Sequence, residues 1–199
     1  MRIRGCGLQP KSVFESRDEA LLMIPFFLKF ACNLLYFDSI INNKLVGCGS
    51  GYLTSCFGRL LSNAKGSEQT PLGIRGKAWG IDFVPYLVEM SEYNTKKADA
   101  DLLESGTVSF LRGDGWKGLP DEAPFQAIHV GAAADTFPKN LMMQLAVGGV
   151  MIIPVGPQLG GQALYRIERV KESPTFNTSD FVMTQLLGVR YVPLVHAQK

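Results

Sequence analysis

Between residues 45 and 155, short apolar runs alternate with segments in which apolar side chains recur at helical spacing. The strand-like runs cover 45–46, 77–82, 107–111, 125–130 and 150–155. The helical segments cover 52–61, 85–97 and 138–145, and further strand patterns follow at 163–170 and 181–193. Short strands that alternate with helices predict an α/β fold, a mostly parallel sheet with helices on both faces.

Polar stretches between these runs are predicted to be turns and loops. Asn42-Asn43-Lys44 is turn-like, which makes the first strand very short. Gly148-Gly149 is predicted to turn the chain into the strand at 150–155, and residues 62–75 are predicted to form a solvated loop. Because the first strand is expected near the centre of the sheet, its shortness predicts either an exposed core that the apolar stretch at 21–37 covers or an unstable domain.

An apolar stretch at 21–37 is interrupted by Pro25 and Lys29. A membrane span needs about 20 apolar residues with almost no charge. A signal peptide would place basic residues beside the apolar run, where this chain has Asp18 and Glu19. We therefore predict a buried or partner-facing helix, kinked near Pro25, and not a membrane anchor.

The length of 199 residues, with 46% hydrophobic and 19% charged side chains, fits one globular domain, alone or with an appendage. The net charge of +2 is too small to indicate a nucleic-acid partner. The four cysteines lack C-x-x-C spacing and only two histidines are present, so we expect no metal site. The cysteines are typical of reduced thiols, and we expect a cytoplasmic monomer.

A glycine-rich turn connects the first strand to the helix at 52–61. Gly47, Gly49 and Gly51 allow the backbone to turn sharply and to approach a ligand closely. The N–H groups at the start of the helix then face that ligand, which suits a cofactor carrying a carboxylate or a phosphate. The G-x-G-x-G spacing differs from the dinucleotide fingerprint, and no phosphate-binding G-x-x-x-x-G-K-[ST] motif is present.

Two acidic residues follow the next two strands of the predicted sheet. Asp82 ends the second strand and Asp114 comes directly after the third. Ligands of such sheets bind beyond the carboxyl ends of the strands, at the point where the strand order reverses. A carboxylate at Asp82 would accept hydrogen bonds from ribose hydroxyls, and one at Asp114 would accept from an adenine amino group. Together with the glycine turn, these acids predict an adenosine site.

Other chemically notable residues have ordinary structural interpretations. His129 lies in an apolar strand and is predicted to be a core histidine and not a catalytic base. Trp79 and Trp116 are predicted to pack. Cys48 is either a reactive thiol at a helix N-terminus or a small residue in a tight turn, and the second interpretation is favoured.

Several segments carry a resemblance to one family. They are VGCGSGYLT (46–54), GID (80–82), GDG (113–115), APFQAIHVGAAA (123–134), GGVMIIPVG (148–156) and LGVRYVPL (187–194). In this order they resemble protein-L-isoaspartate (D-aspartate) O-methyltransferase. The resemblance implies a class I S-adenosylmethionine-dependent methyltransferase fold, Rossmann-like, with S-adenosyl-L-methionine as cofactor. It implies methyl transfer to the free α-carboxylate of L-isoaspartyl and D-aspartyl residues in damaged proteins, which is a repair reaction.

The resemblance also implies which residues form the site. It places Gly47, Cys48, Gly49 and Gly51 at the methionine end of the cofactor. Asp82 would bind the ribose, with Phe83 beside it among the cofactor contacts, and Asp114 and Gly115 would lie near the adenine. The substrate peptide would be held by Val189, Arg190, Tyr191, Val192, Pro193 and Leu194.

The chain departs from the family before the glycine turn. The family has a Thr-Ile-Ser-Ala-Pro-His-like motif whose serine lies beside the reacting carboxylate, and residues 1–45 contain no such motif. Leu45 stands where the family has an acid, and we expect residues 1–45 to form an atypical N-terminal segment that resembles nothing in the family, ahead of a methyltransferase domain at 46–199. That segment would come from an alternative first exon, a mis-joined gene model or a lineage-specific replacement.

No catalytic residue can be assigned without the serine motif, and three hypotheses follow. The first is an isoaspartyl protein repair methyltransferase. The second is a catalytically impaired isoform or relative that binds S-adenosylmethionine or protein without turnover. The third is a nicotinamide-dependent oxidoreductase on a similar sheet, which the glycine spacing and Asp114 disfavour.

Overall fold

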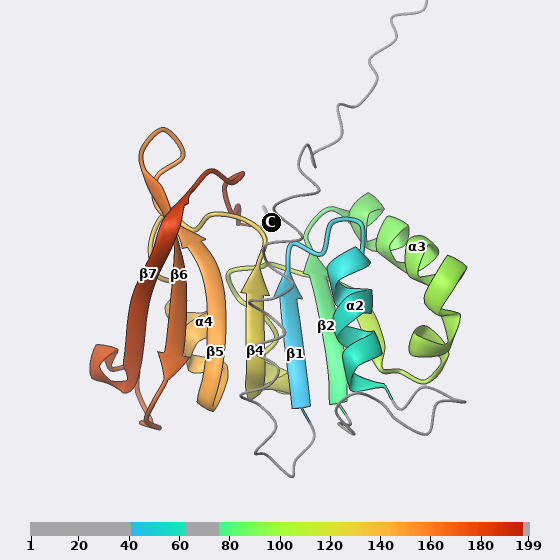
Figure 1. Ribbon diagram of the computed structural model, residues 1–199, viewed down its shortest axis with the longest axis horizontal. Helices are drawn as coiled ribbons and strands as arrows, with labels where there is room; N and C mark the ends of the chain where they lie inside the picture. The colour runs from blue at the N-terminus through green and yellow to red at the C-terminus, as the bar shows by residue number, and fades with distance from the viewer. Residues whose placement is uncertain (1–40, 63–75, 197–199) are drawn as a thin grey trace, which may run out of the picture. The chain divides into compact units, whose positions relative to one another are not determined.

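The computed structural model describes residues 41–62 and 76–196. Its strands are β1 (Ile41–Val46), β2 (Gly76–Asp82), β3 (Val108–Arg112), β4 (Phe125–Val130), β5 (Leu145–Val155), β6 (Gln162–Arg169) and β7 (Phe181–Val189). Its α-helices are α2 (Tyr52–Leu61), α3 (Pro85–Glu104) and α4 (Lys139–Met143), and two 3₁₀ turns, η2 (Pro120–Glu122) and η3 (Thr178–Asp180), lie between strands. Figure 1 shows these elements along one sheet.

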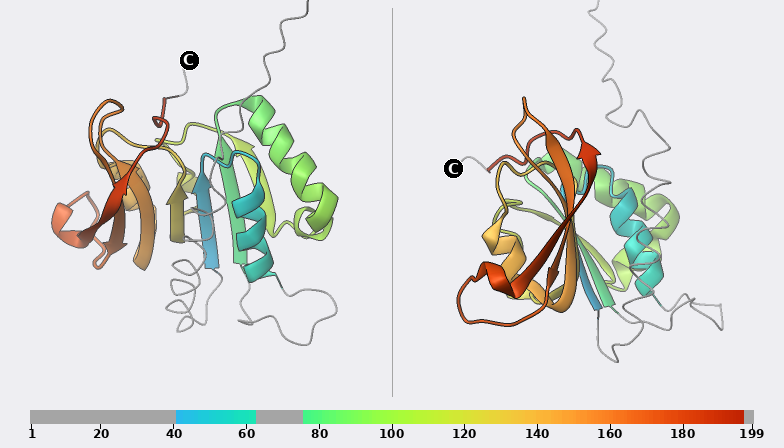
Figure 2. Two further views of the ribbon diagram at one scale, coloured as in Figure 1. Left: turned by 45° about the horizontal axis from the view of Figure 1, so that its top comes forward. Right: turned by 60° about the vertical axis from the view of Figure 1, so that its left-hand side comes forward.

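The seven strands form a single sheet in the order β3-β2-β1-β4-β5-β6-β7. Strands β1 to β5 pair in parallel, and β6 and β7 pair antiparallel at one edge. Helices α2 and α3 cover one face and α4 covers the other, as Figure 2 shows. The expected mostly parallel sheet with helices on both faces is therefore confirmed, and the strand order reverses between β1 and β4, where a ligand of such a fold binds.

Strand β1 differs from the expectation. It has six residues, Ile41–Val46, and pairs with β2 along its whole length and with β4 from Asn43 onward. The turn predicted at 42–44 is therefore wrong, and residues 41–45 lie in the sheet. Strand β2 supplies a ladder partner for all three turn-like residues and β4 for Asn43 and Lys44, and this pairing overrides the low strand preference of asparagine and lysine.

Several element ends also differ from the expectation. Helix α2 matches it, but α3 continues to Glu104 and changes direction at Asp99, where φ is −133° and ψ is 40°. Strand β5 begins at Leu145, so Gly148-Gly149 lies inside a strand instead of forming a turn. Strand β7 ends at Val189 and not at 193.

Three predictions lie wholly or mostly outside the described residues: the atypical N-terminal helical segment at 1–45, the helix at 21–37 and the loop at 62–75. Within 41–62 and 76–196, no helix is long and apolar enough to cross a membrane.

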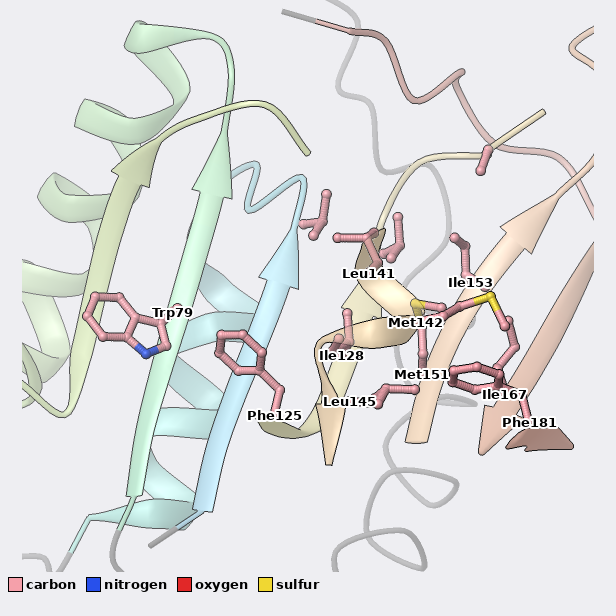
Figure 3. Packing of buried hydrophobic residues seen from close by; sticks show 13 residues of the cluster. Trp79, Phe125, Ile128, Leu141, Met142, Leu145, Met151, Ile153, Ile167 and Phe181 are labelled. Carbon is pink, nitrogen blue, oxygen red and sulfur yellow. The ribbon is translucent and has the colours of Figure 1, made fainter. Parts of the chain in front are cut away.

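The hydrophobic core fills the space between the sheet and α4, as Figure 3 shows. Phe125 of β4, Leu141 of α4 and Met151 of β5 have no exposed surface. The core extends from Trp79 in β2 to Phe181 in β7, and Trp79 has the packing role expected of it. This packing fixes the strands firmly, so the residues at their carboxyl ends have defined positions.

Candidate functional site at the carboxyl ends of the strands

The glycine turn between β1 and α2 has three residues in the left-handed region. The φ angles are 78° at Gly47, 56° at Gly49 and 81° at Gly51. A Cβ on Gly51 would lie 2.9 Å from backbone and side-chain atoms of Ser91, so only glycine lets α2 begin this close to α3. The backbone N–H groups of Gly47 and Cys48 both donate to the Ile81 carbonyl, at 2.8 and 3.0 Å. The turn is thus folded against the end of β2.

Helix α3 supports the turn from the other side through two polar side chains that the sequence interpretation did not single out. Ser91 Oγ donates to the Gly49 carbonyl at 3.1 Å, and Asn94 Nδ2 donates to the Ser50 carbonyl at 3.1 Å. Ser91 is fully buried. These residues are three apart and therefore share one helix face, and that polar pair on a packed helix was the available signal.

Asp82 ends β2 with its carboxylate beside the glycine turn. Its Oδ2 accepts from the Gly49 N–H at 3.4 Å, and its Oδ1 accepts from the Val84 N–H at 3.1 Å. The residue is 8% exposed, whereas its neighbour Phe83 is 42% exposed. The structure therefore brings Asp82 and the turn together, as the sequence predicts for one site.

Asp114 follows β3 and is held by its own loop. Its Oδ1 accepts from the Trp116 N–H at 2.9 Å, and its Oδ2 lies 3.8 Å from His196 Nδ1. Trp116 donates from Nε1 to the Leu194 carbonyl at 2.9 Å, and its ring stacks on His196 with centroids 4.9 Å apart. Trp116 thus packs as expected, but its partners come from the C-terminal part of the chain.

Gly115 packs the loop that follows β3 against the end of β1. A Cβ on this residue would lie 2.6 Å from Val46 Cγ1 and 3.0 Å from Leu194 Cδ1. No larger side chain fits between these neighbours. Contacts within the protein therefore require glycine at this position. The loop that carries Asp114 therefore lies directly beside the residue that precedes the glycine turn.

The segment that follows β7 crosses to the loop after β4. The Gln162 side chain holds Tyr191 on both sides: Oε1 accepts from the Tyr191 N–H at 2.6 Å, and Nε2 donates to its carbonyl at 3.3 Å. The Ala133 N–H donates to the Val192 carbonyl at 2.8 Å, and the Ala133 carbonyl accepts from the Leu194 N–H at 2.7 Å. Residues 189–194 thus run along the same edge as the glycine turn, with Val192 60% exposed.

Cys48 is buried in the glycine turn, with Sγ 3.3 Å from Ser91 Oγ. Burial raises the pKa of the Cys48 thiol to about 11. A thiol with this pKa is protonated near pH 7 and is a poor nucleophile. The reactive-thiol interpretation of Cys48 is therefore not supported, and the residue is a small buried side chain in a tight turn.

His129 lies in β4 and is partly buried. Loss of solvent lowers the pKa of His129 to about 4, so the ring is neutral near pH 7. A base this weak has little catalytic use at neutral pH, which agrees with a core role. Leu45, beside His129 in the sheet, is 2% exposed. It supplies no hydrogen-bond acceptor at the position where the family resemblance predicts an acid.

Comparison with known proteins shows which family the sequence matches. The family model of protein-L-isoaspartate(D-aspartate) O-methyltransferase matches residues 16–199. The match begins well before the glycine turn, so the expectation that the residues preceding it resemble nothing in the family is wrong.

Individual relatives give the same picture. A protein-L-isoaspartate O-methyltransferase of Triticum aestivum is 42% identical over 150 residues, which are 75% of this chain and 57% of the relative. One of Caenorhabditis elegans is 42% identical over 125 residues, 63% of this chain and 51% of the relative. The chain thus spans about half the length of the curated relatives it matches.

A crystal structure described as a protein-L-isoaspartate O-methyltransferase from Plasmodium falciparum, in complex with S-adenosyl-L-homocysteine, is similar in fold. Its TM-score is 0.65 at 28% identity, with 87% of this chain and 73% of that one covered.

Proposed function

The chain belongs to the protein-L-isoaspartate(D-aspartate) O-methyltransferase family, and from this premise we propose that it is a protein repair methyltransferase. It would transfer a methyl group from S-adenosyl-L-methionine to the free α-carboxylate of L-isoaspartyl and D-aspartyl residues in damaged proteins. The observation that carries the proposal is the meeting of three features at one edge of the sheet. They are the glycine turn, the Asp82 carboxylate that accepts from it, and the Asp114 loop packed against Val46.

The residues at this edge fit the proposed cofactor chemically. Gly49 has open space around the position of a Cβ, and the first N–H groups of α2 have no partner within the helix, which suits a carboxylate. Gly47, Cys48, Gly49 and Gly51 would bind the methionine end. Asp82 would accept from the ribose, next to Phe83, and Asp114 with Gly115 would border the adenine.

The substrate would bind along residues 189–194. Ordered contacts to Gln162 and Ala133 fix the backbone of this segment, while Arg190 and Val192 remain exposed to a partner. A polypeptide is a fitting occupant because an exposed, extended segment offers backbone groups and side chains to another chain.

The proposed reaction needs alignment more than acid–base chemistry. S-adenosyl-L-methionine would supply a methyl group on an already activated sulfonium. The isoaspartyl carboxylate is a nucleophile at neutral pH and needs no base, which agrees with the weak basicity of His129. The chain's residues would therefore act by fixing two ligands in line, and misplacement by about 1 Å can lower the rate about a hundredfold.

A second candidate is a relative that binds cofactor or protein without turnover. Leu45 favours it, because this buried apolar side chain supplies no acceptor near the methionine end. We further propose a cytoplasmic monomer that acts on isoaspartyl-containing proteins and not on nucleic acid, in line with its small net charge of +2.

The deciding experiment is calorimetric titration with S-adenosyl-L-homocysteine, followed by a methyl-transfer assay on an isoaspartyl peptide. One-to-one binding and turnover are expected for the native chain. Asp82→Asn should weaken binding about tenfold or more, whereas the exposed Asp121→Asn should not. Binding without turnover would support the second candidate, and binding of NADH in place of S-adenosyl-L-homocysteine would overturn both.

A further inference from the structure

Lys44 lies in the middle of β1 with its side chain almost fully enclosed. It is 1% exposed and pairs with Trp79 of β2 and Ile128 of β4. Its neighbours on this face, such as Val46, belong to the apolar core. Within 41–62 and 76–196 no carboxylate forms an ion pair with it. A buried amine in this setting is costly, which raises the question of what it does there.

The amine of Lys44 contacts a glutamine side chain and an aromatic ring. Nζ donates to the side-chain carbonyl of Gln144, which directly follows α4, and it lies 4.5 Å from the centroid of the Phe125 ring. The ring offers its negative face to a cation. Neither contact explains the lysine by itself, because an apolar side chain would also pack against Phe125.

Gln144 connects the amine to the loop at 114–119. Its Oε1 also accepts from the Leu119 N–H at 3.0 Å, and its Nε2 donates to the Lys117 carbonyl at 2.7 Å. Gln144 is 6% exposed, so its bonds lie away from competing water. One amide therefore holds two points of this loop, and Lys44 donates to the oxygen of that amide.

The same loop carries the acid proposed for the adenine. The N–H groups of Lys117 and Gly118 both donate to the Asp114 carbonyl, each at 3.1 Å. A continuous set of hydrogen bonds thus runs from Lys44 through Gln144 and Lys117 to Asp114. Rotation of the Gln144 amide would break its bonds to the Leu119 N–H and the Lys117 carbonyl.

We propose that Lys44 is a positioning residue: through Gln144 it holds the 114–119 loop in the conformation that binds the adenine end of the cofactor. The inference rests on the proposed function for the identity of the ligand. The link between Lys44 and the loop stands on contacts within the chain and can be tested without ligand.

The variant Lys44→Met keeps the length of the side chain and removes the donor. Two effects of opposite sign are expected. The melting temperature should stay or rise, because a buried amine, which costs free energy whether it keeps or loses its proton, is replaced by an apolar group. Amide hydrogen exchange at 115–119 should nevertheless become about tenfold faster, because the Gln144 amide loses the contact that orients it. A control is Ile167→Ala, which opens the same core at β6 and leaves the hydrogen-bonding groups of Gln144 unchanged.

Exchange is measured by mass spectrometry on the ligand-free chain, with helix α3 as internal reference. Faster exchange at 115–119 in Lys44→Met but not in Ile167→Ala supports the proposal. Unchanged exchange at 115–119, or equal acceleration in both variants, overturns it. Since no ligand is present, this result is independent of whether the native chain binds S-adenosyl-L-homocysteine.

Ligand affinity gives the second readout. If the native chain binds S-adenosyl-L-homocysteine, Lys44→Met should weaken binding about tenfold. The affinity of Ile167→Ala should stay close to that of the native chain. If Lys44→Met and the native chain bind the ligand with equal affinity, the part of the proposal that concerns cofactor binding is overturned. If native does not bind at all, the proposed function fails while the exchange result still decides the link from Lys44 to the loop.

A pH profile separates positioning from packing. Burial lowers the pKa of Lys44 to about 7. Among residues 41–62 and 76–196, the groups found against Nζ are the Phe125 ring from β4, the Gln144 amide after α4 and the backbone at Gly118, and none of these three titrates. The charged amine donates the stronger hydrogen bond. The ratio of native to Lys44→Met affinity should therefore be larger at pH 6 than at pH 9, and an equal ratio would contradict the role.

Discussion

The two ends of the proposed cofactor site are held in place by different kinds of contact. The glycine turn has several independent supports: the Ile81 carbonyl, the Asp82 carboxylate, and Ser91 and Asn94 from α3. The Asp114 loop depends on one buried amide, Gln144, and on the C-terminal segment. The difference predicts a turn that tolerates the loss of a single contact and a loop that does not.

The largest effect is expected for Gln144→Leu. This change leaves the Leu119 N–H, the Lys117 carbonyl and the Lys44 amine without the partner they share, at a cost of about 3 kcal/mol. Affinity for S-adenosyl-L-homocysteine should fall more than tenfold. Urea unfolding and calorimetry measure the two quantities. Native-like affinity would show that the contact of Trp116 with the C-terminal segment is enough to hold the loop.

The next effect concerns pH. The pKa of Lys44 is lowered from 10.5 to about 7, so between these values the unfolded chain binds a proton that the folded chain does not. Stability therefore rises with pH across this window. Cys48, whose pKa is raised from 9.0 to about 11, has the opposite influence above pH 9. Between pH 7 and pH 9 the free energy of unfolding should rise by about 2 kcal/mol in the native chain.

In Lys44→Met this rise should disappear, since methionine does not titrate. Urea unfolding at a series of pH values measures it. A rise of equal size in both proteins would mean that other groups cause the pH dependence, and that the buried amine is charged in both states.

Gly51→Ala tests the tolerance of the glycine turn at its most restrictive point. At φ 81° an alanine is strained, and its Cβ would lie 2.9 Å from Ser91 atoms that cannot move freely within α3. We expect a loss of about 2 kcal/mol in stability together with weaker ligand binding. Gly106→Ala is the matched control, because its φ of 70° carries the same strain without a neighbour within 4 Å. Equal losses of stability in the two variants would show that the loss comes from the positive φ angle and not from the contact with α3.

Ser91→Ala should have a smaller effect, because it removes one support of several. The loss of its bond to the Gly49 carbonyl should lower stability by about 1 kcal/mol. Affinity for S-adenosyl-L-homocysteine should change by less than about threefold, since Asp82 and Ile81 still hold the turn. A tenfold loss of affinity would show that the glycine turn is as sensitive to the loss of one contact as the Asp114 loop.

The smallest effect is expected for Arg59→Ala, which calibrates the series. Arg59 joins α2 to α3 by donating to Asp99 at 2.8 Å and to Asp101 at 2.6 Å, at a partly exposed position. Partly exposed ion pairs contribute little, so Tm should fall by at most about 3 °C. Neither ligand affinity nor exchange at 115–119 should change. A change in affinity would mean that the α2–α3 contact also sets the site.

The sequence was sufficient for features that depend on local signals. The glycine turn, the bounds of α2, and Asp82 at the end of β2 could be predicted because each has its pattern within a few neighbouring residues. Strand β1 could not, because Asn42, Asn43 and Lys44 have turn-like preferences that only the flanking strands override.

The supports of the site were beyond prediction for a related reason. Lys44 and Gln144 are 100 residues apart, and Ser91 is 42 residues from Gly49. Neither pair has a shared motif, so only the fold brings them together. The contact of Trp116 with Leu194, 78 residues apart, joins a predicted packing residue to a segment predicted to bind substrate.

The crossing of residues 191–194 to Ala133 has a consequence for synthesis on the ribosome. Trp116 and Asp114 meet partners at Leu194 and His196, which are among the last of the described residues to be translated. Domains fold while the chain emerges, N-terminal parts first. The sheet from β1 to β5 can therefore assemble while this side of the site is still incomplete. A nascent chain gains its finished site only when residue 196 has left the exit tunnel.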